Sequence, residues 1–497
     1  MSSPPPREEL DRQVSLQSSE EGTEVEYSPS EEYPGKKYPL QLDNFGFILN
    51  VDSDGRVCQN IVDGAVRPRA TTLAEKQKTI KREKKWDMQL AAWDSTTLKA
   101  KQNSKKFIKR LRKGIPESKR GEVWLLLAGG IQKPGYYEDI VKKTTILMLA
   151  SYREIADSQK MQEASVKTSP TASESSSFLP KEETNPIIEV DTDSEEDFAS
   201  TRAFRHIQDI IDRDIHRTYP KHKLFYDAQH NTDSTASTSD SDVVRGVADP
   251  ELAATILSLE VDLEFTASGG AKKRVTNSMN STLTPGGQAA LRRVLRAYSY
   301  HDRDVGYCQG MNFIAGMFLT QLSEEEAFWV LVGVMNREPC HMRGLFREGM
   351  AITHKVLHVA EQLTYLHLPR LARHFKKEHI HVTMYATQWL LTQYTSSFNF
   401  DLVVRVWDSF LGEGWKIIYR VMLALLSQSQ QKLLKMGFED MLAYFRELPG
   451  RINANAVMAI ASKIPLKTKQ IKKFEREWEV VRARKAATEK DQIEENP

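Results

Sequence analysis

The sequence predicts an all-α protein in which one large helical core is accompanied by segments that stay disordered. Apolar residues recur at the i, i+3, i+4, i+7 spacing of an amphipathic helix, as they do at Leu291, Val294, Leu295 and Tyr298. Only 40% of the 497 residues are hydrophobic, and stretches rich in Ser, Thr, Asp and Glu dilute that fraction. One helical core with disordered additions fits this composition better than several compact domains.

The N-terminal region, residues 1–72, is predicted to be largely disordered. Residues 1–37 are rich in Ser, Glu and Pro and hold few large apolar side chains, so burial cannot offset the entropy lost on ordering. Residues 42–62 differ, because two short apolar runs flank a turn-like segment at 52–55. Either a small hairpin or an extended strap over the main domain fits this segment.

A basic helical segment is expected over residues 73–106. Residues 76–120 hold 16 Lys and Arg against 4 Asp and Glu. Trp86, Leu90 and Trp93 recur at helical spacing, which predicts amphipathic helices with these three side chains packed inward. Two interpretations of the positive charge remain open: a solvated helix face, or a surface that attracts anionic lipid or an acidic protein.

Composition excludes several classes of function. The chain has 69 Lys and Arg against 67 Asp and Glu, a balance that predicts no dedicated binding of nucleic acid. Cys58, Cys308 and Cys340 show neither paired nor metal-ligand spacing, which indicates a reducing compartment without disulfides or a zinc site. The start is polar, and no run approaches the roughly 18 apolar residues that span a bilayer. We therefore expect a cytoplasmic protein whose membrane contact, if any, is peripheral.

Two low-complexity insertions are expected, over residues 156–200 and 228–284. The first is rich in Ser, Thr and acidic residues, a composition typical of disordered inserts. Within the second, residues 257–265 alternate apolar and polar side chains like a strand, whereas residues 249–250 resemble a helix start. Strand and helix both remain open there.

The helical core is predicted from apolar stripes and end signals. One helix starts near Thr201 and carries an apolar stripe up to Ile215, with Arg217 at its end before Pro220. Ser323 and Glu326 form a capping-box pattern before another helix. Further helical patterns cover residues 124–127, 136–152, 311–319, 363–375, 386–394, 401–411, 415–426 and 467–489.

Two stretches carry candidate chemistry, IDRDIHRTYP at 211–220 and VGYCQGMN at 305–312. Asp214 and Arg217 are three positions apart, so a helix would place both on one face; alone, such a pair is typical of a solvated surface. Gln309 precedes a buried run, where a capping or turn role competes with the orientation of a water molecule. Arginine and glutamine together favour phosphoryl transfer, in which the first neutralises charge on the phosphate and the second positions the attacking water.

These residues resemble the TBC domain of Rab GTPase-activating proteins. The pattern I-x-x-D-x-x-R-T-x-P matches residues 211–220, and Y-C-Q-G matches residues 307–310. Further motifs match at Gly114, Ile115, Pro116, Arg120, Gly121 and Trp124, at residues 389–394 and at residues 405–414. The resemblance implies a two-lobed helical TBC domain over 107–462, followed by a charged C-terminal helix and tail over 463–497.

The resemblance implies that the chain activates a GTPase in trans and is not a nucleotide hydrolase itself. Arg217 would enter the active site of a GTP-bound Rab and stabilise charge on the phosphoryl group, and Gln309 would replace the GTPase's own glutamine in orienting water. GTP and magnesium would come with the partner, so neither a cofactor nor a metal is expected here. The process regulated would be vesicle traffic. The alternative is a non-catalytic TBC-like scaffold that binds a GTPase or a membrane partner.

Other matching residues are interpreted as support. We expect Asp214 to hold a local hydrogen bond or the rotamer of Arg217, because a carboxylate beside the phosphates would oppose catalysis. The remaining supporting residues, two beside Gln309 and the others mainly framework, are Tyr307, Gly310, Arg120, Trp124, Trp389, Arg405 and Asp408.

Overall fold

The structure is a computed structural model, and it describes residues 42–49, 72–93, 104–148, 151, 195–226, 286–347 and 349–495. All of these residues belong to one compact unit. The predicted disorder of residues 1–37, the turn at 52–55 and the second insertion over 228–284 lie outside the described residues, as does most of the first insertion.

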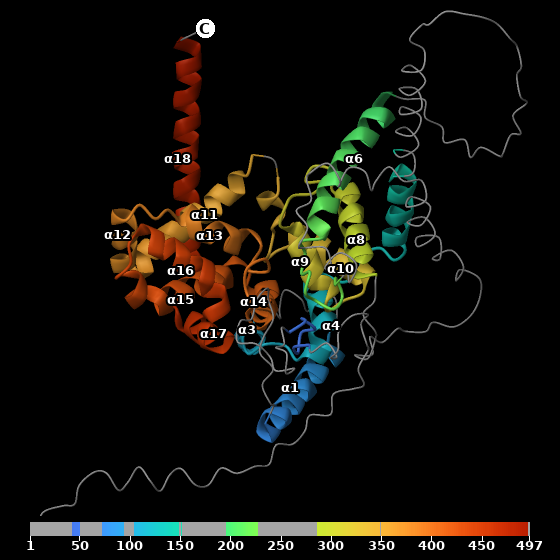
Figure 1. Cartoon of the computed structure of the whole chain (residues 1–497), viewed down its shortest axis with the longest axis horizontal. Coiled ribbons are helices and arrows are strands. Elements are labelled where there is room, and N and C mark those ends of the chain that lie inside the picture. The colour runs from blue at the N-terminus through green and yellow to red at the C-terminus, as the bar shows by residue number, and fades with distance from the viewer. Residues whose placement is uncertain are drawn as a thin grey trace, which may run out of the picture. The chain divides into compact units, whose positions relative to one another are not determined.

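Within the described ranges all regular elements are helices, which confirms the all-α prediction (Figure 1). The first group is α1 (Leu73–Ala91), α3 (Lys105–Arg112), α4 (Glu117–Ala128), α6 (Glu195–Ile215), α8 (Gly287–His301), α9 (Met311–Leu319) and α10 (Glu324–Asn336). The second is the short 3-10 helix η1 (Arg343–Leu345), α11 (Ala351–His367), α12 (Pro369–Lys377), α13 (Val382–Leu391), α14 (Phe400–Glu413), α15 (Trp415–Leu433), α16 (Phe438–Arg451), α17 (Ala454–Lys463) and α18 (Thr468–Glu495). Residues 136–148 are helical as well.

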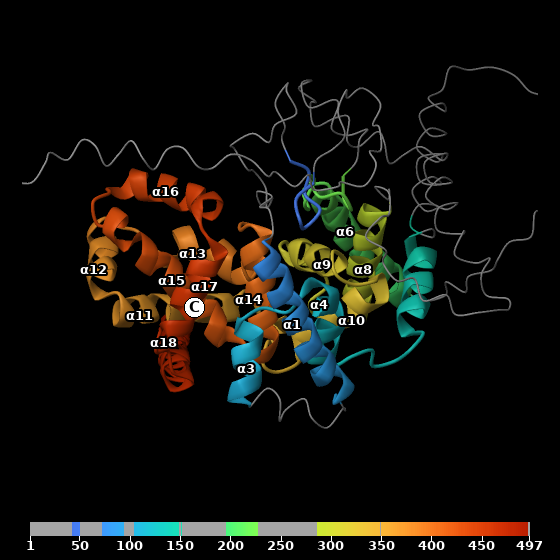
Figure 2. The same ribbon diagram turned by 90° about the horizontal axis from the view of Figure 1, so that it is seen from below.

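The helices pack as two lobes that meet at α14. In the N-terminal lobe, α8 contacts α6, α9 and α10, and α4 contacts α10. In the C-terminal lobe, α11 contacts α12, α13, α15 and α18, and α15 contacts α17. Helix α14 contacts α3 and α4 on one side and α15 and α17 on the other (Figures 1 and 2). The two candidate finger motifs both belong to the N-terminal lobe.

Aromatic rings join the centre of the N-terminal lobe to α14. Trp124 of α4 is completely buried, and its ring centroid lies 6.1 Å from that of Phe318 on α9. Phe318 in turn meets Trp407 of α14 edge to face, with centroids 5.0 Å apart. Edge-to-face pairs of this kind add to the gain from burying large apolar area. The predicted burial of the helix around Trp124 is confirmed.

Several helix ends follow the expected local signals, and others do not. At the start of α10 the Glu326 carboxylate accepts a hydrogen bond of 3.0 Å from the Ser323 backbone N–H, as the capping-box pattern predicts. The single helical pattern over 363–375 is wrong, because α11 ends at His367 and Pro369 begins α12. Proline lacks the N–H that a continuous helix would need, and it suits a first helical turn.

Helix α6 also differs from its prediction at both ends. It begins at Glu195, so residues 195–200, expected to belong to the acidic insertion, are part of the helix. It ends at Ile215, so Arg217 lies in the turn that follows and not in the helix.

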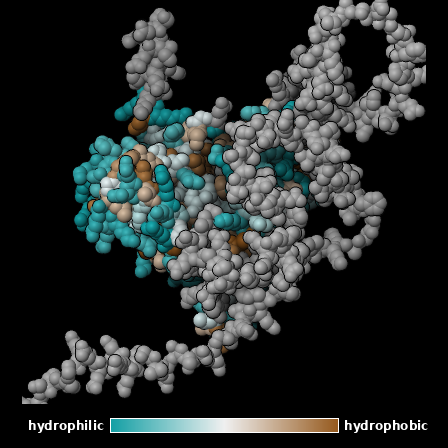
Figure 3. Space-filling view, viewed as in Figure 1, coloured by the Kyte–Doolittle hydropathy of each residue, from teal (hydrophilic) through white to brown (hydrophobic). Residues whose placement is uncertain are grey.

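The surface carries mainly hydrophilic side chains over the C-terminal helices, with small hydrophobic patches between them (Figure 3). Among the described helices none is both long and apolar enough to cross a membrane.

Candidate functional site

Arg217 is presented by a tight turn at the end of α6. Ile211 and Ile215 are completely buried and fix the last turn of the helix in the core. The Thr218 hydroxyl donates a hydrogen bond of 2.8 Å to the Asp214 backbone carbonyl, which closes the turn around Arg217. The Arg217 side chain remains 46% exposed. A buried helix end thus carries an accessible guanidinium.

Asp214 contacts both candidate motifs. Its Oδ1 lies 2.5 Å from Nη2 of Arg217, so the two residues pair although Arg217 lies beyond the helix that the prediction assumed. Its Oδ2 accepts a hydrogen bond of 2.6 Å from the Tyr307 hydroxyl, two residues before Gln309. The Asp214 side chain is only 6% exposed, so these contacts replace water. One carboxylate therefore holds the arginine turn against the loop that carries Gln309.

Gln309 is exposed immediately before α9. The next residue, Gly310, is the N-cap of α9 and has a φ of 106°, a conformation that side chains rarely adopt. A Cβ atom at Gly310 would also lie 3.2 Å from the Thr392 methyl group. Glycine at this position lets the chain turn sharply and directs Gln309 out of the buried helix.

Asn312 connects the same two segments from inside the protein, and sequence reasoning assigned it no role. Its side chain is completely buried, and its Nδ2 donates a hydrogen bond of 2.8 Å to Thr218 Oγ1. Its Oδ1 accepts a hydrogen bond of 3.0 Å from the Gly310 N–H. The available signal was a lone amide at the start of an otherwise apolar run, since a buried polar group needs partners.

Burial and the nearby Asp214 carboxylate keep the Tyr307 hydroxyl and the Cys308 thiol protonated. Burial, followed by the Asp214 carboxylate, raises the pKa of Tyr307 well above its usual value, so the hydroxyl stays protonated and donates. The same two causes raise the pKa of Cys308. A thiol with a raised pKa is a poor nucleophile, which argues against covalent chemistry at Cys308.

The loop before Gln309 is held by a second ionic contact that the sequence did not reveal. Arg343 donates to both Asp302 carboxylate oxygens at 2.6 Å and to Asp304 at 2.8 Å. Burial acts to raise the pKa of Asp302, but the hydrogen bonds from Arg343 outweigh it, so the pKa is lowered. The bidentate ion pair of Arg343 with Asp302 fixes the loop between the end of α8 and Tyr307.

A segment near the N-terminus, residues 42–49, covers the chain just after the arginine turn, and we call it the N-terminal strap. Ile48 N–H donates to the Lys221 carbonyl at 2.7 Å, and Lys223 N–H donates to the Gly46 carbonyl at 2.8 Å. These bonds make an isolated antiparallel bridge between Phe47 and His222. A second isolated antiparallel bridge joins Leu42 to Ile48 within the segment, and the turn at 52–55 on which the hairpin alternative depends lies outside the described residues.

Phe47 anchors the N-terminal strap in an aromatic cluster. It is completely buried, with ring centroids 4.8 Å from Phe400, 4.9 Å from His222 and 6.0 Å from Tyr219. The Tyr219 hydroxyl donates to the carbonyl of Phe313 on α9 at 2.8 Å. The strap, the chain after Arg217 and α9 are therefore packed into one unit.

His222 is a neutral hydrogen-bonding residue in this cluster. Its Nε2 lies 2.8 Å from the Phe45 carbonyl, and its Nδ1 accepts a hydrogen bond of 3.1 Å from the Leu224 N–H. This pattern requires one protonated and one unprotonated ring nitrogen. Burial lowers the pKa of His222 to about 4.

Arg120, Trp124 and Asp408 form a separate buried centre. Asp408 is completely buried and accepts hydrogen bonds from the Ile115 N–H at 2.6 Å and from Trp124 Nε1 at 2.9 Å. Arg120 Nε lies 3.3 Å from the same carboxylate. Burial raises the pKa of Asp408, and Arg120 opposes that shift. The first and last family motifs thus meet between α4 and α14, as a framework would.

The other two predicted supporting residues lie elsewhere. Arg405 donates to the Arg112 carbonyl at 3.1 Å and to Asn455 Oδ1 at 2.8 Å, so it joins α14 to α3 and α17. Trp389 is buried on α13, where its ring centroid lies 5.4 Å from that of Phe398. Neither makes a described contact with the cluster around Asp214.

Comparison with known proteins agrees with the motifs. Residues 260–434 match the family model of the Rab-GTPase-TBC domain, a range that includes Gln309 and follows Arg217. The ecotropic viral integration site 5 ortholog of Drosophila melanogaster is 43% identical over 195 residues, which are 39% of this chain and 24% of that protein. The ecotropic viral integration site 5 protein homolog of Homo sapiens is 36% identical over 201 residues, which are 40% of this chain and 25% of that protein.

A further relative is the Rab GTPase-activating protein eat-17 of Caenorhabditis elegans, 37% identical over 195 residues, or 39% of this chain and 22% of that protein. The matched region spans about a quarter of the length of these relatives. The motif matches and the family model agree in one respect: residues 260–434 are similar to the Rab-GTPase-TBC domain.

Proposed function

We propose that this chain is a GTPase-activating protein that acts in trans on the GTP-bound form of a Rab-family GTPase. The observation that carries the proposal is that the Asp214 carboxylate contacts Arg217 directly and the Gln309 loop through Tyr307. Both finger side chains are exposed while their supports are buried. Relatives named as Rab GTPase-activating proteins support the same activity.

Arg217 supplies positive charge to the transferring phosphoryl group. Of its three guanidinium nitrogens, Nη2 contacts Asp214, and the side chain is 46% exposed. The planar guanidinium can hold Asp214 at one edge and still present donors to two phosphate oxygens. Asp214 thus restricts the rotamer of Arg217 before the GTPase binds, which reduces the entropy lost in the transition state.

Gln309 orients the water that attacks the γ-phosphate. Its amide offers a carbonyl oxygen that accepts a water hydrogen and an NH₂ group with two donors, and it carries no charge that would oppose the phosphates. GTP and magnesium arrive with the GTPase, and this chain adds neither a metal nor a cofactor. The proposed activator acts in the cytoplasm and regulates vesicle traffic. The GTP that is hydrolysed is bound by the partner GTPase, so this chain is not an enzyme with a substrate of its own.

The expected effect is large. An arginine finger supplied in trans contributes roughly 10³- to 10⁵-fold to the rate of GTP hydrolysis. That acceleration corresponds to about 4–7 kcal/mol of the activation barrier.

The test is single-turnover GTP hydrolysis by a panel of purified Rabs, with and without the full chain. Arg217→Ala and Gln309→Ala should each abolish most of the acceleration, whereas the matched exposed variants Arg373→Ala and Gln428→Ala should keep it. A chain that binds a GTP-loaded Rab but accelerates none of the panel would be the non-catalytic scaffold instead.

A further inference from the structure

Helix α1 exposes a regular stripe in which apolar and lysine side chains alternate. Leu73, Lys76, Ile80, Lys84 and Met88 follow one another at spacings of three or four residues, so they lie along one side of the helix. Leu73 is 72% exposed, Ile80 51% and Met88 63%, and both lysines are exposed. We call these five residues the outer stripe of α1.

The opposite side of α1 is fixed to the domain, so the outer stripe cannot turn inward. Trp86 is only 1% exposed, and its ring meets Phe107 of α3 edge to face with centroids 5.8 Å apart. Arg82 donates a hydrogen bond of 2.9 Å to the Lys113 carbonyl and contacts the Gly114 carbonyl as well. As predicted from the sequence, the aromatic residue of α1 packs inward.

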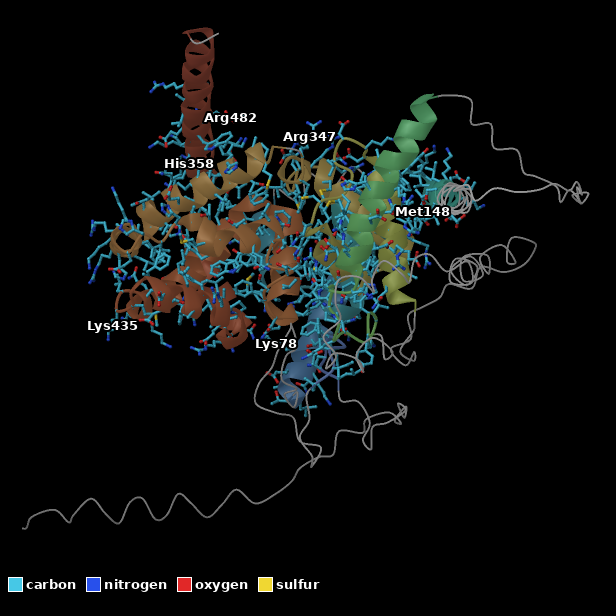
Figure 4. The ribbon with its side chains drawn as sticks, turned by 45° about the horizontal axis from the view of Figure 1, so that its top comes forward. Lys78, Met148, Arg347, His358, Lys435 and Arg482 are labelled. Carbon is cyan, nitrogen blue, oxygen red and sulfur yellow. The ribbon has the colours of Figure 1, made fainter. Side chains whose placement is uncertain are left out.

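The charged side chains of α1 are mostly positive. The helix holds six Lys and Arg and three acidic residues, Glu75, Glu83 and Asp87. Each acidic residue already contacts another side chain of the domain, namely Thr72, Ser118 and Lys119 respectively. Neighbouring α3 adds five Lys and Arg and no acidic residue, and its Lys105, Lys106 and Lys109 are exposed. Positive charge therefore dominates this surface, where Figure 4 labels Lys78.

A membrane surface satisfies both kinds of side chain in the stripe. Apolar side chains can enter the boundary between headgroups and acyl chains, while lysine ammonium groups stay among anionic headgroups on their flexible stems. A protein groove that covered Ile80 and Met88 would also have to desolvate Lys84 between them, and that requires a matching buried carboxylate. The alternation of the two kinds of residue therefore favours a membrane.

We propose that the outer stripe of α1 binds the surface of an anionic phospholipid membrane. The helix lies along the interface, with Leu73, Ile80 and Met88 inserted and Lys76 and Lys84 at the headgroups. The exposed Lys105, Lys106 and Lys109 of neighbouring α3 add to the positive charge that attracts the membrane. This proposal does not depend on the GTPase-activating function, because it concerns where the domain is held.

The test is co-sedimentation of the full chain with vesicles of phosphatidylcholine, with or without phosphatidylserine. Wild type should bind only the vesicles that contain phosphatidylserine, and less so as salt is raised. Replacing Lys76 and Lys84 of the stripe, together with the exposed Lys81 beside Ile80, by Gln should weaken binding about a hundredfold, at ~1 kcal/mol for each lysine near the surface. Replacing the three apolar residues of the stripe by Ser should also release the protein.

The matched controls carry the same changes at exposed positions of other helices. They are Lys463→Gln with Lys469→Gln and Lys472→Gln, and Leu366→Ser with Met384→Ser and Phe438→Ser. These variants should bind vesicles as wild type does. Wild type that ignores anionic vesicles, or stripe variants that bind like the controls, would overturn the proposal. So would stripe variants that keep vesicle binding but lose GTPase stimulation without vesicles, because the stripe would then contact the GTPase.

Discussion

The side chains of Asp214 and Tyr307 share a hydrogen bond of 2.6 Å although 93 positions separate them in the sequence. Asp214 also pairs with Arg217, so movement of the arginine turn is linked to movement of the loop that holds Gln309. The proposed function needs both side chains in place at one moment, and this contact links their positions.

We expect Tyr307→Phe to lower stimulated GTP hydrolysis by about tenfold, the cost of ~1.4 kcal/mol of lost positioning. Stability should fall by about 1–3 kcal/mol, because a buried carboxylate loses a donor. The measurement is single-turnover hydrolysis beside urea unfolding. In an Arg217→Ala background the same change should lower the rate less than in wild type, because the part that acts through Asp214 and Arg217 is already lost.

Tyr444→Phe is the matched control for that variant. Its hydroxyl donates to Ser429 at 3.0 Å inside the C-terminal lobe, so it too loses a buried hydrogen bond. It should lower stability and leave stimulated hydrolysis unchanged. Equal loss of activity in both tyrosine variants would mean that Tyr307 contributes to stability alone.

Arg217→Lys separates the shape of the guanidinium from its charge. The side chain is 46% exposed, so the domain should remain folded. A lysine keeps the charge but cannot span two phosphate oxygens, so most of the ~10³- to 10⁵-fold stimulation should be lost while affinity for GTP-bound Rab changes little. A binding isotherm and a hydrolysis rate measured on the same variant distinguish loss of affinity from loss of rate. Loss of rate only in proportion to loss of binding would contradict a transition-state role.

Trp124→Ala should destabilise the domain by about 3–5 kcal/mol, because it removes a large buried ring. It also removes the indole N–H that donates to Asp408 at 2.9 Å. Trp124→Phe keeps an aromatic ring and should cost less, about 1–3 kcal/mol, because the Asp408 carboxylate loses one donor while Ile115 and Arg120 remain. Urea unfolding followed by circular dichroism tests both values, and an unchanged midpoint for the alanine variant would contradict the buried framework.

Stability should fall on acidification because of His222. Burial lowers its pKa to about 4, whereas a histidine in an unfolded chain titrates near ~6.5. Between these values the unfolded chain binds a proton that the folded chain excludes, so stability present above pH ~6.5 is lost as the pH falls towards 4, by up to ~3 kcal/mol. Unfolding free energies at pH 7 and pH 5 measure this loss.

His222→Gln should reduce that pH dependence, and the exposed variant His381→Gln should retain it. His301 and His367, whose pKa values are also lowered by burial, are present in both proteins and supply a common background. An identical pH dependence in the two variants would show that His222 remains accessible to protons.

Sequence patterns predicted those parts of the fold that depend on neighbouring residues. The helical stripes, the capping interaction of Ser323 with Glu326 and the inward packing of Trp86 all follow from spacing along one segment. Pro369 divided a predicted helix, although the residue itself carried the signal that should have ended it.

Contacts between distant segments could not be predicted from the spacing of residues within one segment. Asn312 looks like an ordinary polar residue until α9 brings it to Thr218. The bridge between Phe47 and His222 forms because the N-terminal strap packs against the loop after Arg217, which lies about 175 positions further along the chain. Asp214 was expected to hold the rotamer of Arg217, and its bond to Tyr307 needed the packing of α6 beside α9.

The N-terminal strap has a consequence for where the domain should be cut for expression. A fragment that began at Gly114, with the first family motif, would lack Phe47 and leave Tyr219, His222 and Phe400 facing solvent beside the arginine turn. Such a fragment would retain both finger residues yet lose the packing that holds one of them. A fragment that keeps this packing has to include residues 42–49, well before the recognisable motifs, so inactivity of a shorter fragment could reflect its boundary rather than its chemistry.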